Sequence, residues 1–92
     1  MATPAERAAI LGMSAADVER ELLLRAGATQ YTRFMVAQTY ATALVFGPDA
    51  IDWHRINAAI LARFSKSGLT WIKREAWRMF SPHSVRTQGR RR

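Results

Sequence analysis

The sequence predicts an all-α fold, a small bundle of about five helices whose C-terminal pair is helix-turn-helix-like. Three observations favour it. Helix-capping and helix-ending residues recur along the chain, apolar residues between them follow helical spacing, and the longest uninterrupted segment is too long for a strand. Ninety-two residues suffice for one small core. We therefore expect residues 1–80 to form a single helical domain and residues 81–92 a flexible basic tail.

The first two predicted helices have capping signals at their N-termini. In each, a hydroxyl residue is followed three positions later by an acid, which is the spacing of a capping box or a close variant of it. A glycine then ends each helix. These signals are Thr3 and Glu6 before Gly12, and Ser14 and Asp17 before Gly27.

The third segment, residues 30–46, contains Thr, Tyr, Val and Phe residues that favour a strand by propensity. However, it runs for about seventeen residues without Gly, Pro, Asn or Asp, whereas strands average about five or six residues. Arg33 is its only charged residue. We therefore predict a helix that lies in the middle of the bundle.

The last two helices are expected from about Ala50 to Ser65 and from about Leu69 to Phe80, joined by a short turn at residues 65–68. Asn57 falls within the apolar arc of the first of them, and we interpret it as a hydrogen-bonded buried amide. The predicted core residues are Trp53, Ile56, Ile60, Leu61 and Phe64 in one helix, and Leu69, Ile72, Ala76, Met79 and Phe80 in the other.

The positive charge of the chain is confined to its second half. The whole chain has 14 Lys or Arg and 7 Asp or Glu residues, for a net charge of +7. Residues 1–46 contain four of each sign, so residues 47–92 carry all of this charge. A high arginine content also fits a GC-rich genome, but the segregation indicates an anionic partner for the second half.

The C-terminal pair has the outline of a helix-turn-helix unit, in which the second helix enters the major groove and the first contacts the backbone. Phe64, four positions before Gly68, departs from the small residue typical of the bacterial motif. We predict a small nucleic-acid-binding module, with DNA favoured over RNA, in a regulatory or accessory role. Its expected contacts are Thr70, Trp71, Arg74 and Arg78 on the second helix, Arg55, Arg63, Lys66 and Ser67 near phosphates, and Arg90, Arg91 and Arg92 in the tail.

Trp71 has three interpretations, because it is expected opposite the core arc and beside Arg74 and Arg78. It could stack on an unpaired base. It could instead anchor a protein-interaction module, an inhibitor or assembly subunit that docks on an acidic surface, or form a homodimer contact. The third interpretation is burial in the core, as is common for large aromatic residues. Trp53 and Trp77 are expected to be structural.

Other classes of function are disfavoured. The chain has no cysteine, which excludes disulfides, thiolate zinc sites and a thiol nucleophile. His54 and His83 have no neighbouring carboxylate cluster, and there is no glycine-rich phosphate loop. We expect no enzymatic activity, cofactor, metal or small-molecule substrate. Without a signal-peptide pattern or membrane-length apolar run, a cytoplasmic location is the default. Binding to a membrane surface is disfavoured because the core requires the apolar arc of the last helix.

Overall fold

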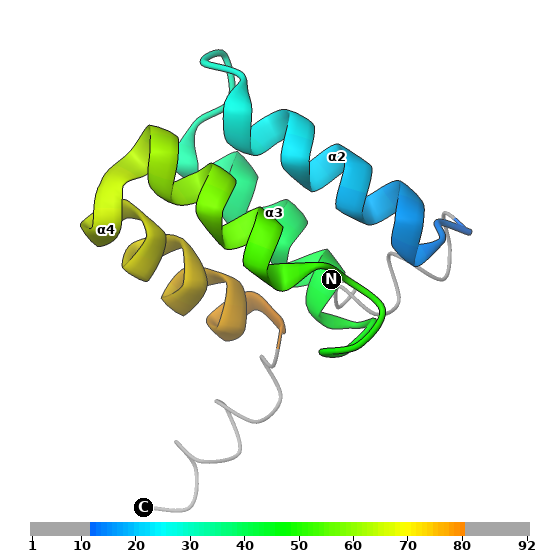
Figure 1. Ribbon diagram of the computed structural model, residues 1–92. Coiled ribbons are helices and arrows are strands. Elements are labelled where there is room, and N and C mark those ends of the chain that lie inside the picture. Colours follow the sequence, from blue (N-terminus) through cyan, green and yellow to red (C-terminus); the bar gives the residue numbers. More distant parts are fainter. Residues whose placement is uncertain (1–11, 81–92) are drawn as a thin grey trace, which may run out of the picture.

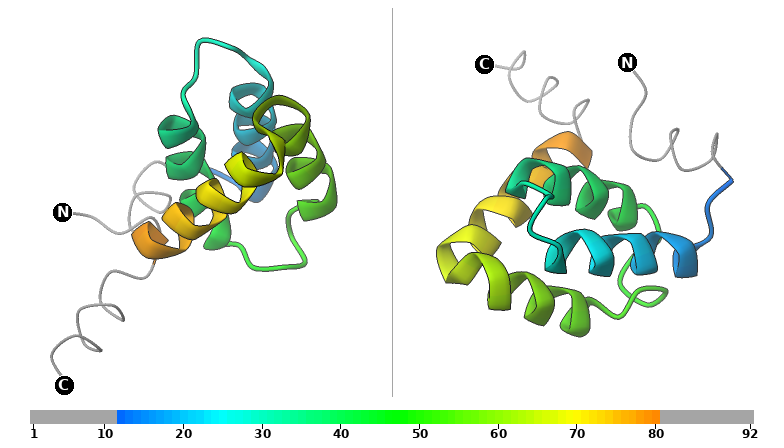
Figure 2. Two further views of the ribbon diagram at one scale, coloured as in Figure 1. Left: turned by 90° about the vertical axis from the view of Figure 1, so that its left-hand side faces the viewer. Right: turned by 90° about the horizontal axis from the view of Figure 1, so that it is seen from above.

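The computed structural model describes residues 12–80, and within that range the chain is all-helical. The three helices found there are α2 (Ala15–Gly27), α3 (Arg33–Leu44) and α4 (Trp53–Phe80). Each helix packs against the other two. A sharp bend at Ser65 divides α4 into residues 53–64, the first arm, and residues 66–80, the second arm. The arms open from this bend as a V (Figures 1 and 2).

The all-α class is confirmed, but the number of helices differs from the predicted five. The predicted helix that ends at Gly12 and the predicted tail lie outside the described residues. The fourth and fifth predicted helices correspond to the two arms of α4, which meet at the non-helical Ser65, so the expected break is present but is shorter than the predicted turn at residues 65–68. The last two helical segments of the bundle are therefore joined at a single non-helical residue, Ser65.

Local sequence accounts for where α2 and α3 begin. Ser14 and Asp17 form the predicted capping box, in which the Asp17 amide donates to the Ser14 hydroxyl at 3.1 Å. The Thr32 hydroxyl caps α3 by accepting from the Met35 amide at 3.3 Å. Residues 33–44 are helical despite their strand propensity, because three or more turns of apolar side chains pack between α2 and α4.

The core is formed by aliphatic and small residues from every helix. One expectation about the core is wrong: Leu61 is 45% exposed, because it lies one residue past the buried Ile60 and is thus rotated away from the core. Ile51, in the loop before α4, is also buried. The largest fully buried side chains are Val18, Leu22, Val36, Ile56, Ile60 and Ile72.

A polar contact fixes the first arm of α4 against α3. The Tyr40 hydroxyl donates to Asn57 Oδ1 at 2.9 Å, so this amide is hydrogen-bonded as predicted but is only half-buried. The Tyr40 ring lies 4.9 Å from the Trp53 ring, and Trp53 Nε1 donates to the Gly47 carbonyl at 2.9 Å. Burial raises the pKa of the Tyr40 phenol, so the hydroxyl remains a donor at neutral pH. Trp53 has the structural role expected for it.

The bend in α4 is made by one residue in an unfavourable backbone conformation. Ser65 has φ +70° and ψ 178°, a region occupied almost only by glycine. Gly68 was expected in the turn but is buried within the second arm. A Cβ atom at position 68 would lie 2.6 Å from Phe64 Cβ, so only glycine permits this close approach of the two arms.

We predict that Ser65→Gly raises the free energy of unfolding by about 1 kcal/mol, because glycine removes backbone strain of roughly 1–3 kcal/mol at a smaller entropic cost. Urea denaturation measures the change. Ser67→Gly is the matched control, since position 67 is exposed and helical, and it should lose about 0.5–1 kcal/mol. Equal losses in the two variants would show that Ser65 is not strained.

Candidate nucleic-acid interface

The second arm of α4 presents one continuous solvent-facing stripe, here called the outer face. Its members recur at helical spacing and lie opposite the buried Gly68, Ile72 and Ala76. Packing of these three residues against the rest of the core determines which side chains point outward. The outer face consists of Lys66, Ser67, Thr70, Lys73, Arg74, Trp77 and Arg78, all of which are exposed.

The outer face holds the excess positive charge of the described residues. Residues 12–65 contain five basic and five acidic residues and are therefore neutral. The second arm contains four basic residues and one acid, Glu75. The Glu75 side chain is only 16% exposed and pairs with Arg78, whose own side chain remains 66% exposed. An approaching anion therefore meets cations and little opposing charge on this face.

The structure brings together most of the contact residues predicted on the second helix. Thr70, Arg74 and Arg78 share the outer face with Lys66 and Ser67. The Thr70 hydroxyl donates to the Lys66 carbonyl at 3.0 Å, and the Ser67 hydroxyl lies 3.3 Å from that of Ser65. The charged groups of this set provide most of its capacity to bind an anion, because the Thr70 hydroxyl already donates within the helix.

The first arm contributes less positive charge than the sequence predicts. Arg55 is exposed near the beginning of α4, where its backbone amide donates to Asp52 Oδ1 at 3.2 Å. No exposed Lys or second exposed Arg accompanies it on this arm. Its exposed neighbours there are His54, Ala58, Leu61 and Ala62. The remaining predicted contacts, Arg90, Arg91 and Arg92, lie outside the described residues.

Arg63 was expected to contact phosphate, but its guanidinium group is bound within the protein. Nε donates to the Ala26 carbonyl at 2.6 Å, and Nη2 donates to the Arg25 and Tyr31 carbonyls at 3.1 and 2.5 Å. The guanidinium carbon also lies 4.1 Å from the centre of the Phe64 ring. Arg63 thereby satisfies carbonyls at the C-terminus of α2, where a cation is favourable. It joins α4 to α2 and does not belong to the outer face.

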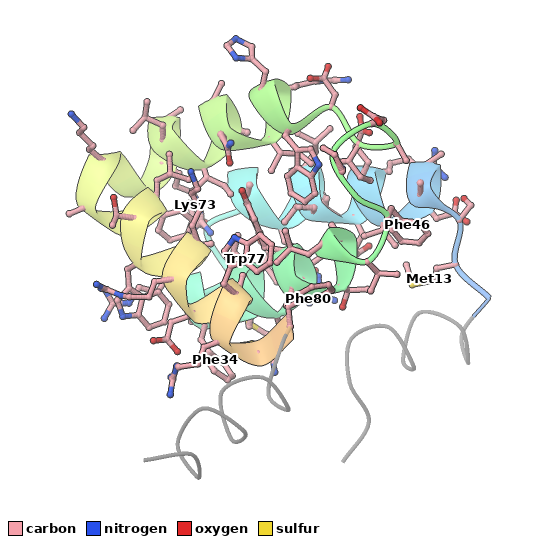
Figure 3. All side chains as sticks on the ribbon, turned by 90° about the horizontal axis from the view of Figure 1, so that it is seen from below. Met13, Phe34, Phe46, Lys73, Trp77 and Phe80 are labelled. Atoms are coloured by element: carbon pink, nitrogen blue, oxygen red, sulfur yellow. The ribbon has the colours of Figure 1, made fainter. Side chains whose placement is uncertain are left out.

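Of the three interpretations of Trp71, the structure favours burial, whereas Trp77 is more exposed than expected. Trp71 is half-buried against the core, and the Arg33 guanidinium covers its ring at 4.2 Å from the ring centre. Core packing is therefore the interpretation that fits Trp71. Trp77, expected to be structural, is 52% exposed and lies on the outer face near Lys73 (Figure 3). Its spacing of seven residues from Thr70 and four from Lys73 could have identified this position.

The other surfaces of residues 12–80 offer weaker candidates. A cleft of about 230 Å³ between α2 and α3 contains Glu21 and Arg25, which pair with each other at 2.5 Å. No group of three His, Asp or Glu side chains in this part of the chain could hold a metal ion. None of the helices described has the length and apolar character needed to cross a bilayer. The outer face is the feature that calls for a functional explanation.

We predict that Arg63→Ala lowers the free energy of unfolding by about 2–3 kcal/mol, because it leaves partly buried carbonyls without their charged donor. Arg63→Lys should recover little, since a single ammonium group cannot reproduce the planar contacts of guanidinium. Denaturation of Arg55→Ala is the control, with a change within about 0.5 kcal/mol. Equal changes in the free energy of unfolding for Arg63→Ala and Arg55→Ala would contradict the structural role of Arg63.

Comparisons of the chain with models of known protein families, with curated protein sequences and with solved structures find no match. The charge, exposure and residue types of the outer face are therefore the observations from which a function can be inferred.

Proposed function

We propose that this protein is a small nucleic-acid-binding module that uses the outer face of α4 in a regulatory or accessory role. The second arm corresponds to the recognition helix of a helix-turn-helix-like pair, and the first arm holds it against the core. DNA is the favoured polymer.

The observation that carries this proposal is the one-sided distribution of charge. Lys66, Lys73, Arg74 and Arg78 lie on one exposed stripe, while the rest of the described residues are neutral in sum. Cations that contact phosphates release condensed counterions, and this release drives binding without requiring base-specific contacts. In the sequence, four further arginines follow the second arm within residues 81–92.

We predict that Arg74→Gln weakens binding to all DNA sequences and reduces the slope of log affinity against log salt by about 1. Fluorescence anisotropy of labelled single-stranded and duplex DNA measures both effects. Arg20→Gln is the charge-matched control, because Arg20 is an exposed residue of α2 paired with Asp17, and its affinity should remain near wild type. Absence of wild-type binding to either DNA at about 50 mM salt would contradict the proposal.

A second candidate function is docking on an acidic protein surface, as an inhibitor or assembly subunit. The half-exposed Trp77, packed edge-on against Phe80 and flanked by cations, has the composition of a protein-interaction hot spot. Trp77 replaces Trp71 as the proposed anchor, because Arg33 covers Trp71. Arg74 and Arg78, which were expected beside Trp71, share the outer face with Trp77.

Salt dependence separates the two functions. Four phosphate contacts predict roughly a hundredfold loss of affinity for duplex DNA between about 50 and about 200 mM salt. A docked indole anchor should lose far less, since its energy comes mainly from apolar burial. The docking function therefore predicts proteins that remain bound after nuclease treatment at about 200 mM salt and are lost with Trp77→Ala. Their loss on nuclease treatment alone would contradict it.

A further inference from the structure

We infer that the outer face of α4 prefers unpaired nucleotides to a duplex, with Trp77 stacking on a base while Lys73 and Arg74 hold the adjoining phosphates. This inference rests on the proposed nucleic-acid-binding function and specifies its substrate class. It assigns Trp77 the role of a stacking residue on the second arm (Figure 3).

The exposure of Trp77 sets it apart from the other two tryptophans. Trp53 is half-buried and donates to the Gly47 carbonyl, and Trp71 is half-buried beneath Arg33. The Trp77 side chain is instead 52% exposed. The Phe80 ring lies 5.4 Å from it in an edge-to-face arrangement, which limits the orientations of the indole. Trp77 is thus an oriented indole, about half of which is exposed to solvent.

The surroundings of Trp77 favour a polyanion as its occupant. Lys73 precedes it by one helical turn on the same side, and Arg74 and Arg78 flank that side. Lys66 lies seven residues before Lys73, or about 10 Å along the helix axis. Glu75 lies off this stripe and is mostly buried. A strand that follows the second arm can therefore keep its phosphates near cations while one base reaches the indole.

Base stacking requires a strand whose base faces are accessible. In a duplex, neighbouring base pairs cover both faces of each base, so an indole at the surface can reach only base edges, sugars and phosphates. An unpaired base leaves a face free, and stacking on an aromatic side chain contributes about 1–3 kcal/mol per base. Trp77 consequently adds affinity for a single strand that it cannot add for a duplex.

The test compares Trp77→Ala with wild type on oligothymidylate and on a duplex of the same length and label. We expect about ten- to a hundredfold weaker binding to the single strand and less than about threefold change for the duplex. Leu61→Ala is the matched control, because Leu61 is 45% exposed on the first arm and should change neither affinity. The salt slope of Trp77→Ala should equal that of wild type, since no charge is removed.

Tryptophan fluorescence provides a readout that a purely structural role would not change. Oligothymidylate should quench the emission of wild type, whereas Trp77→Phe should bind within about tenfold of wild type with much of the quenching lost, because phenylalanine still stacks. Quenching of equal amplitude in wild type and Trp77→Phe would overturn the stacking role.

The outcomes distinguish failure of this inference from failure of the proposed function. If wild type binds both DNA forms and Trp77→Ala weakens them equally, or weakens neither, the preference for unpaired nucleotides is overturned and nucleic-acid binding stands. If wild type binds neither form at about 50 mM salt, the proposed function and the inference both fail.

Discussion

The bend at Ser65 is the constraint on which the rest of the structure depends. A straight α4 would extend its second half away from α2 and α3 and expose Ile72 and Ala76 to water. The bend returns this arm to the core, where both residues are fully buried. Because successive side chains of a helix are rotated by about 100°, burying these residues points Lys73, Arg74 and Trp77 outward. The bend at Ser65 thus determines both the burial of Ile72 and Ala76 in the core and the position of the charged outer face.

Residues of one chemical type have opposite roles on the two arms of α4. Arg63 directs its guanidinium group inward to three carbonyls and connects the first arm to the end of α2. Arg74 lies eleven residues later and remains exposed. Gly68, between them, permits the close contact with Phe64 that accompanies the change of direction. The number of arginines in the sequence therefore overstates the basic surface, and their bonding partners determine its position.

Features encoded in short stretches of sequence could be predicted, whereas those decided by tertiary contacts could not. The capping box at Ser14 and the hydrogen-bonded amide of Asn57 follow from spacing and residue chemistry. A break at residues 65–68 could be predicted, but its confinement to Ser65 could not, because a positive φ at a serine is unfavourable locally and persists only through the packing of both arms. Gly68 resembles a turn residue for the same reason that it permits close packing, namely its lack of a side chain. The spacing of Trp77 from Thr70 and Lys73 indicates that the three share a face, but tertiary packing decides how much of the indole is exposed.

The central claim is that nucleic acid binds on the outer face of α4 and not elsewhere on the described surface. Its most direct test is to map backbone and indole N–H chemical shifts of ¹⁵N-labelled protein during titration with oligothymidylate. The account predicts that the largest changes occur at Lys73, Arg74 and the Trp77 indole, with small changes along α2. Changes centred on α2 or on its cleft with α3, or no change at saturating oligonucleotide, would contradict it.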